Sequence, residues 1–115
     1  MDVLLYHNPR CSKSRACLAL LQQQGIEPKL RLYLDNPPNA AEIKQLLNWL
    51  KVDARQLMRK QEAEYQTAKL DNPTLSEAQL INAMVTMPKL IERPIAICGH
   101  RAVIGRPPEA VLGLL

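Results

Sequence analysis

Cys11 is the residue whose type and surroundings in this sequence could do chemistry. An apolar run over residues 3–6 precedes it at strand length, and the apolar run over residues 16–21 is typical of a buried helix. We therefore expect Cys11 at a strand-to-helix turn, where unpaired backbone N–H groups and the positive end of the helix dipole meet. Such a place favours thiolate over thiol, and a thiolate in a positive environment is a nucleophile that attracts anions.

The neighbours of Cys11 decide between a functional and a purely structural cysteine. A lone cysteine is often a small buried apolar residue. Polar residues on both sides, among them Arg10, Lys13 and Arg15, argue against burial and add positive charge. The context therefore favours a reactive thiol.

The other cysteines are interpreted differently. On one helix, Cys17 would lie about 9 Å along the axis from Cys11, beyond the reach of a disulfide, and we expect it in the core. Cys98 ends an apolar strand and is also expected in the core. A place near Cys11 stays open for it, because Arg93-Pro94 lies close by in the sequence.

The composition indicates one small globular domain with an aliphatic core. The chain has 115 residues, of which 47% are apolar, and it contains no Phe. Its net charge of +4 fits a small anionic ligand or an acidic partner. The basic residues are scattered and aromatic residues are few, so nucleic acid is not an expected partner.

The cysteine count and the hydropathy bound the cellular setting. Three cysteines without a C-x-x-C pair predict neither a disulfide framework nor a zinc site, and we expect no metal. No signal-peptide pattern and no apolar run of 18 residues is visible, so we expect a cytoplasmic protein with no membrane partner. With no wide apolar surface evident, we expect a monomer.

Hydrophobic periodicity divides the chain into a βαβ unit, a helical middle and a ββα end. Strict alternation of polar and apolar residues over the first half of the segment 29–34 predicts a half-buried strand. Asn39 with Glu42, and Ser76 with Gln79, resemble capping boxes that begin two of the middle helices. The predicted elements are a strand at 2–7, a helix at about 11–24, a strand at 29–34, helices within about 39–88, strands at 95–98 and 101–104, and a last helix beginning in 105–109.

Five short motifs are spread from residue 7 to residue 109. They are His7-Asn8-Pro9-Arg10-Cys11, Tyr33-Leu34-Asp35-Asn36-Pro37-Pro38, Leu57-Met58-Arg59-Lys60, Glu92-Arg93-Pro94-Ile95 and Gly105-Arg106-Pro107-Pro108-Glu109. Together they resemble the motifs of the glutaredoxin-dependent arsenate reductase (ArsC-like) family, in its chromosomal YfgD-like branch. The resemblance implies an α/β, thioredoxin-like three-layer fold with a four-stranded mixed sheet. It also implies one domain over residues 1–115, with the helical segment inserted between the two sheet-forming halves.

The same resemblance implies an oxyanion site around a catalytic Cys11. The positions that match the arginines holding the oxyanion are Arg59, Arg93 and Arg106, and a guanidinium fork suits such a ligand. Position alone favours a solvated helix face for Arg59. Arg93 and Arg106 each precede a proline, which restricts their backbone and fixes the direction of their side chains.

Three further residues are expected to support the site. His7 matches the histidine upstream of the family's cysteine, where it could orient or tune the thiol, and backbone contacts alone could also account for it. Pro94 matches the cis proline of the fold. Ser14 stands where a redox dithiol would carry its second sulfur, and it is expected to bond the thiolate or to serve the helix locally. One departure is Ser12, where better-studied members have Gly.

The resemblance implies that arsenate, or a similar oxyanion, is reduced without a tightly bound cofactor. Cys11 attacks arsenic, glutathione acts as the co-substrate that carries the reduction, and glutaredoxin resolves the resulting mixed disulfide. The physiological substrate is left open, and Ser12-Lys13 could alter substrate preference.

Three other functions could use some of the same residues. A cysteine phosphatase is set aside, because its loop needs an arginine at the position of Cys17. A glutathione-dependent thiol oxidoreductase would use Cys11 without needing three arginines. A regulator that binds RNA polymerase, like the related Spx proteins, would carry a Cys-x-x-Cys switch, and Ser14 replaces its second cysteine.

Overall fold

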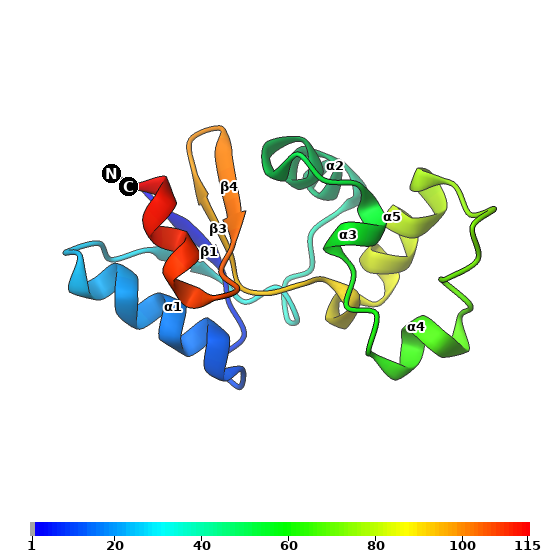
Figure 1. Cartoon of the computed structure of the whole chain (residues 1–115), viewed down its shortest axis with the longest axis horizontal. Helices are drawn as coiled ribbons and strands as arrows, with labels where there is room; N and C mark the ends of the chain where they lie inside the picture. Colours follow the sequence, from blue (N-terminus) through cyan, green and yellow to red (C-terminus); the bar gives the residue numbers. More distant parts are fainter. Residues whose placement is uncertain (1) are drawn as a thin grey trace. The chain divides into compact units, whose positions relative to one another are not determined.

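The computed structural model describes residues 2–115, which form two compact units (Figure 1). The first consists of the chain up to Asn36 together with Arg93–Leu115, and the second is Pro37–Glu92. The helices expected within about 39–88 lie inside the second unit. Whether the whole chain acts as a single domain stays a prediction. Among the described residues, no helix has the length and apolar character needed to cross a bilayer.

The first unit is built on a four-stranded mixed sheet in the order β2-β1-β3-β4. β1 runs parallel to β2 and antiparallel to β3, and β3 and β4 form an antiparallel hairpin turned by Gly99 at φ +63°. The mixed sheet predicted from the sequence is thus confirmed. Its elements are β1 (Leu4–Tyr6), α1 (Ser12–Gln23), β2 (Lys29–Arg31), β3 (Ile95–Cys98), β4 (Arg101–Ile104) and the 3₁₀ helix η2 (Pro108–Leu114).

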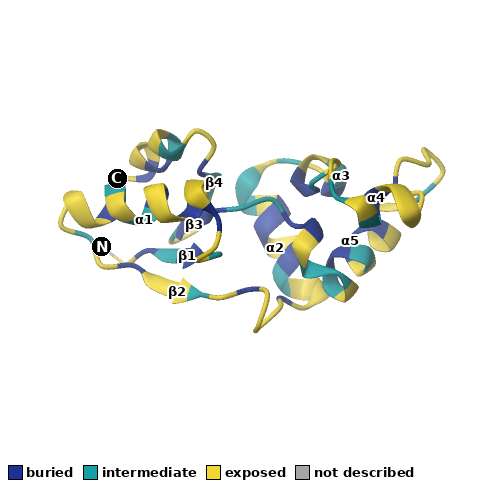
Figure 2. Cartoon of the chain, turned by 90° about the horizontal axis from the view of Figure 1, so that it is seen from below, coloured by how far each residue is buried: buried dark blue, intermediate teal, exposed yellow. Residues whose placement is uncertain are grey.

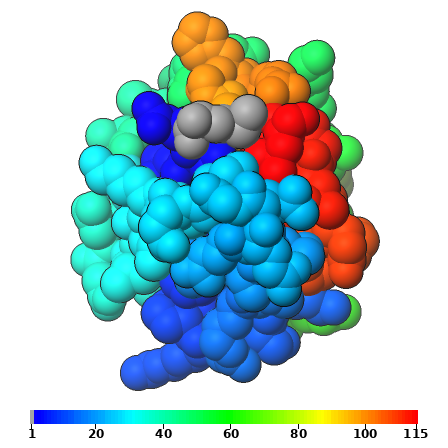
Figure 3. Space-filling model, turned by 90° about the vertical axis from the view of Figure 1, so that its left-hand side faces the viewer, coloured from blue at the N-terminus to red at the C-terminus, as the bar shows by residue number. Residues whose placement is uncertain are grey.

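One face of this sheet is covered by α1 and η2, which pack against each other. Figure 3 shows the C-terminal segment, in red, lying against the α1 segment, in blue. Their buried side chains close over β1 and β3 to form a core of Val3, Leu5, Cys17, Leu21, Ala96, Val111 and Leu114. The predicted last helix is therefore present, but as a 3₁₀ helix. This packing fixes the N-terminus of α1 at the end of β1.

The prediction for β2 is wrong in two respects. The strand ends at Arg31 rather than continuing to residue 34, because the chain turns, with the N–H of Asp35 donating to the carbonyl of Leu32. Tyr33 is buried and stacks on Tyr6, with ring centroids 6.2 Å apart. The expected half-buried strand is not found, because no residue of β2 is buried and the leucines of the alternating segment, Leu30, Leu32 and Leu34, are exposed at 43%, 39% and 43%. Figure 2 shows β2 as an exposed edge beside the buried β1 and β3.

The second unit is a cluster of short helices, two of which, α2 and α5, begin at the predicted caps. Complete capping boxes begin α2 at Asn39, α3 at Asp53 and α5 at Ser76. Such reciprocal bonds satisfy backbone donors that a helix start leaves without partners. The elements are α2 (Ala40–Leu50), α3 (Ala54–Leu57), α4 (Ala63–Thr67), α5 (Glu77–Thr86) and the 3₁₀ helix η1 (Pro88–Leu90).

Candidate active site

Cys11 is the N-cap residue of α1, as predicted, and the turn that carries it is held by Asn8 and Ser14. The N–H of Cys11 donates to the Asn8 carbonyl at 3.0 Å, and the N–H of Arg10 donates to Asn8 Oδ1 at 3.0 Å. The N–H of Asn8 in turn donates to Oγ of Ser14 at 3.3 Å, and Ser14 is fully buried. The hydroxyl of Ser14 therefore serves the turn. The role of Asn8 in this turn was not predicted from the sequence, although an Asn before Pro is a known turn signal.

The surroundings of Cys11 favour the thiolate form of its sulfur. Burial by itself raises the pKa of Cys11. The backbone N–H groups of Ser14 and Lys13, and then the charges of Arg93 and Arg106, outweigh burial and hold the pKa of Cys11 below its ordinary value. Two arginines that are remote in the sequence thus lower the pKa of Cys11, an effect that the sequence led us to expect from the side chains of Arg10, Lys13 and Arg15. A lowered pKa makes Cys11 a thiolate over a wider pH range.

The side chain of Arg106 contacts Cys11. Its Nη2 lies 3.9 Å from Cys11 Sγ, and its Nε donates to the carbonyl of Arg93 at 2.7 Å. The bond to Arg93 orients the guanidinium, because one edge of the planar fork is held by the backbone. Cys11, Arg93 and Arg106 thus come together although they lie up to 95 residues apart in the sequence.

Both arginines precede cis prolines. The peptide bond Arg93-Pro94 is cis, as the resemblance implied, and Arg106-Pro107 is cis as well. The second cis bond was not predicted, since sequence alone gives no signal for it. Gly105 packs directly on Pro94: a Cβ built there would lie 2.8 Å from Pro94 Cγ and 3.2 Å from Cys17 Sγ. Gly105 was also missed, and the absence of a side chain is what allows this approach.

His7 lies at the end of β1 and is buried. Its N–H donates to the Arg31 carbonyl at 2.9 Å, while its ring Nδ1 is buried with no hydrogen-bond partner among the described residues. Burial, helped by the charge of Arg15, lowers the pKa of His7 below its usual range. His7 is therefore neutral near pH 7, and any tuning of Cys11 by an imidazolium charge is not supported.

Arg59 belongs to the helical unit, where it is not on a helix face. Met58 forms an isolated antiparallel bridge with Ile91, and the N–H of Arg59 donates to the Leu90 carbonyl at 2.7 Å. The Arg59 guanidinium pairs with the Glu62 carboxylate and lies 4.0 Å from Glu92. Its role as an oxyanion ligand stays a prediction.

The two remaining cysteines stand apart from the site. Cys17 is fully buried in the core, as predicted, and burial raises its pKa to about 11. Cys98 is at the far end of β3 from Pro94, since Ile95 pairs with Tyr6 while Ile97 pairs with Leu4. Cys98 therefore does not lie beside Cys11. Within residues 2–115, no three His, Cys, Asp or Glu side chains are grouped to hold a metal ion.

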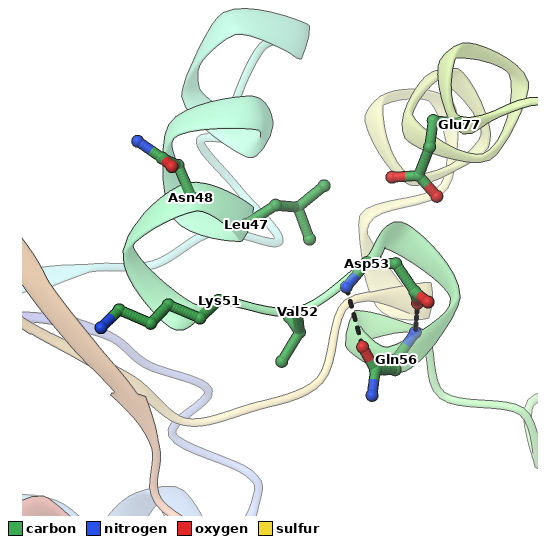
Figure 4. A pocket seen from close by; sticks show the side chains of 7 residues that line it. All are labelled: Leu47, Asn48, Lys51, Val52, Asp53, Gln56 and Glu77. Carbon is green, nitrogen blue, oxygen red and sulfur yellow. Dashed lines mark hydrogen bonds between the residues drawn. The ribbon is translucent and has the colours of Figure 1, made fainter.

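Two surface hollows are candidate ligand sites. One of about 310 Å³ lies in the first unit, beside the turn that carries Cys11. The other, of about 610 Å³, lies between α2 and the start of α3 and includes Glu77 of α5. Figure 4 shows that Asp53 and Gln56 in the second hollow are bonded to each other. Its lining contains no thiol, and Glu77 is engaged with the N–H of Ala54.

Comparison with known proteins places this site in context. The Escherichia coli (strain K12) protein named "Uncharacterized protein YfgD" is 51% identical over 115 residues, covering 99% of this chain and 97% of that protein. A protein of Haemophilus influenzae (strain ATCC 51907 / DSM 11121 / KW20 / Rd), named arsenate reductase, is 47% identical and covers 100% of both chains. A solved structure of an arsenate reductase from Vibrio cholerae superposes with a TM-score of 0.99 at 47% identity, covering 100% of this chain and 98% of that one.

These matches cover nearly the whole chain. The α/β, thioredoxin-like fold predicted from the sequence is confirmed by them. The family model described as ArsC family matches residues 6–114. The chain therefore belongs to the ArsC family.

Proposed function

We propose that this chain is an arsenate reductase that works through a single thiol, Cys11, with glutathione as co-substrate and glutaredoxin as resolving partner. The observation that carries the proposal is the 3.9 Å approach of Arg106 to Cys11 Sγ. It combines a nucleophile of lowered pKa with a cation that can hold an oxyanion next to it. The membership in the ArsC family and the arsenate reductase names of its relatives support the same reaction.

The first step is attack on arsenate by the Cys11 thiolate. Arg93 and Arg106 hold the oxyanion, and the N–H groups at the start of α1 add to its binding. A sulfur–arsenic bond forms, and one arsenate oxygen leaves, after protonation, as water. Arsenic stays pentavalent in this adduct, and no electrons have yet been transferred.

The second step transfers two electrons. A glutathione thiolate attacks Cys11 Sγ, and the electron pair of the sulfur–arsenic bond passes to arsenic. Arsenic becomes trivalent and leaves as arsenite, while Cys11 and glutathione are oxidised to a mixed disulfide. A glutaredoxin thiolate then attacks the glutathione sulfur and releases the Cys11 thiolate. The lowered pKa of Cys11 makes it a good leaving group in this exchange.

The proposal also covers Arg59, the oligomeric state and the cellular compartment. We infer that Arg59 reaches the oxyanion by exchanging the Glu62 carboxylate for an arsenate oxygen. We also infer a monomeric enzyme in the cytosol, where the glutathione pool keeps Cys11 reduced between turnovers. The chemistry requires no metal ion and no bound cofactor, because both electrons come from thiols.

The test is arsenate-dependent NADPH oxidation in an assay coupled through glutathione, glutaredoxin and glutathione reductase. We expect activity in the wild type and none above background in Cys11→Ser. Cys17→Ala tests the single-thiol mechanism, because Cys17 is in the core and should not be needed for turnover. Full activity of Cys11→Ser, or dependence on the Cys17 sulfur, would contradict the mechanism.

The same experiment separates the alternatives. A glutathione-dependent thiol oxidoreductase would reduce a mixed disulfide substrate in this assay and ignore arsenate. A regulator of RNA polymerase would be inert in both assays and would retain polymerase in a pull-down. Ser14 does not favour the regulator, because it holds the turn through its hydroxyl and provides no second thiol.

A further inference from the structure

We propose that the hollow beside the Cys11 turn is the binding site for glutathione in the second step, a proposal that rests on the arsenate reductase function. The hollow has a volume of about 310 Å³. This is at the lower end of the range of about 300–1,000 Å³ found for small-molecule sites, and suits a tripeptide. Its lining includes His7, Pro9, Arg10, Leu32, Leu34 and Asp35.

The position of the hollow fits the thiol chemistry. Pro9 and Arg10, which line it, directly precede Cys11 in the chain. Consecutive Cα atoms are 3.8 Å apart, and an extended tripeptide spans about 10 Å, so a bound tripeptide can bring its central thiol to Cys11. The lining does not include Arg93, Arg106 or Cys11 itself. An oxyanion held by the two arginines would therefore leave the hollow free for the second substrate.

The charges of the hollow match glutathione better than they match arsenate. Arg10 and Asp35 are both exposed, and neither side chain has a charged partner among residues 2–115. Glutathione carries two carboxylates and one ammonium group. The Arg10 guanidinium can bind a carboxylate through two N–H donors, and the Asp35 carboxylate can accept from the ammonium group. A dianionic oxyanion would be repelled by Asp35.

The apolar residues and the buried polar residue that line the hollow also indicate a bound ligand. Leu32 and Leu34 are 39% and 43% exposed, so a ligand that covers them removes apolar surface from water. His7 is 4% exposed, and its Nδ1 is buried without a hydrogen-bond partner. Such an unsatisfied polar atom is uncommon in folded proteins. A peptide amide of glutathione in the adjoining hollow could donate to it or accept from it.

The test compares reductants in the coupled arsenate assay. We expect Arg10→Gln and Asp35→Asn each to raise the KM for glutathione by about tenfold, because each loses one charge-assisted interaction. The KM for arsenate should not change. Lys44→Gln and Asp71→Asn remove exposed charges of the same sign outside the hollow, and they serve as matched controls.

A thiol without charged ends isolates the contribution of the hollow. With 2-mercaptoethanol as the sole reductant, in an assay that measures arsenite directly, Arg10→Gln and Asp35→Asn should match the wild type. An unchanged KM for glutathione in both variants would overturn the proposal. An equal loss with 2-mercaptoethanol would overturn it too, since the substitutions would then act on the arsenate step.

Binding of S-methylglutathione keeps this proposal separate from the proposed function. This analogue lacks a free thiol, and we expect it to shift the amide resonances of residues 7–10 and 32–35 in an NMR titration of the wild type, with both variants binding more weakly. If the analogue binds in this way but the protein does not turn over arsenate, the reductase function is contradicted and the assignment of the hollow as a glutathione site is supported. Turnover without any shift in these residues would contradict the hollow alone.

Discussion

The Nη2 atom of Arg106 lies 3.9 Å from the Sγ atom of Cys11, at a contact between residues 95 positions apart in the sequence. The same guanidinium is tied through Nε to the Arg93 carbonyl, so its position does not depend on a bound ligand. A cation fixed beside a sulfur favours thiolate before any substrate arrives, and it can then hold an anionic substrate at the same place.

Arg106→Gln should therefore impair both reactivity and substrate binding. Because the charge of Arg106 lowers the pKa of Cys11, its loss should move the pH profile of Cys11 alkylation by iodoacetamide to higher pH. A hydrogen bond to a charged group contributes about 1.5–3 kcal/mol, so kcat/KM for arsenate should fall by about 10- to 100-fold. Lys13→Gln keeps the Lys13 backbone N–H and removes only a nearby side-chain charge. A shift of the alkylation profile in Lys13→Gln as large as in Arg106→Gln would show that local charge controls the thiol.

Gly105→Ala should disturb the active site through a clash with Pro94. The added Cβ would lie 2.8 Å from Pro94 Cγ, within a ring that cannot change rotamer freely. Relief requires a shift of Pro94 or of the backbone that leads into Arg106. We expect a destabilisation of about 1–3 kcal/mol, typical of overpacking, measured by urea unfolding, together with a lower kcat/KM for arsenate. Gly113→Ala meets no atom within 4 Å and should leave both quantities close to wild type.

Much of the fold follows from local signals that the structure obeys. Asn39 and Ser76 begin helices through the capping boxes that their spacing predicts. The hairpin around Gly99 has the glycine at the position that needs a positive φ. In such places the sequence and the fold impose the same requirement over a few residues, so the pattern alone is sufficient.

The errors arise where distant contacts overrule a local pattern. The leucines within residues 29–34 alternate with other residues as in a half-buried strand, yet Tyr33 is the residue that turns inward, because it stacks on Tyr6 of β1. No pattern within residues 29–34 reveals that partner. The same holds for the charges around Cys11. Arg10, Lys13 and Arg15 are near Cys11 in the sequence, yet the side-chain charges that lower the pKa of Cys11 belong to Arg93 and Arg106. The family motifs, and not the periodicity, pointed to these two arginines.

Cys17 should make the protein less stable at high pH. Burial raises its pKa from 9.0 to about 11, so the folded state keeps a proton that the unfolded state loses above about pH 9. The contribution of the Cys17 thiol to the free energy of unfolding is therefore complete below pH 9, and it is lost as the pH rises toward 11. The loss is about 2–3 kcal/mol, at 1.36 kcal/mol per pKa unit.

Urea unfolding at pH 7 and pH 10.5 measures this contribution. Cys17→Ala removes the thiol, and its free energy of unfolding should fall less than that of the wild type between the two pH values. Val111→Ala truncates another side chain of the same core without removing a titratable group. It should lose stability at both pH values and keep the pH dependence of the wild type. Equal pH dependence in all three proteins would mean that the Cys17 thiol does not contribute.

The pairing of Arg59 with Glu62 should limit arsenate binding, if Arg59 is the third ligand. Both side chains are partly exposed, at 25% and 23%, and exposed ion pairs contribute about 0–1 kcal/mol. Glu62→Gln should free the guanidinium and lower the KM for arsenate by at most about fivefold, which corresponds to about 1 kcal/mol. Arg59→Gln should raise the KM for arsenate while leaving the alkylation profile of Cys11 unchanged, because Arg59 is not among the groups that set its pKa. Lys60→Gln, next to Arg59 and exposed, is the matched control. An arsenate KM in Arg59→Gln equal to that in Lys60→Gln would leave Arg93 and Arg106 as the arginines that hold the oxyanion.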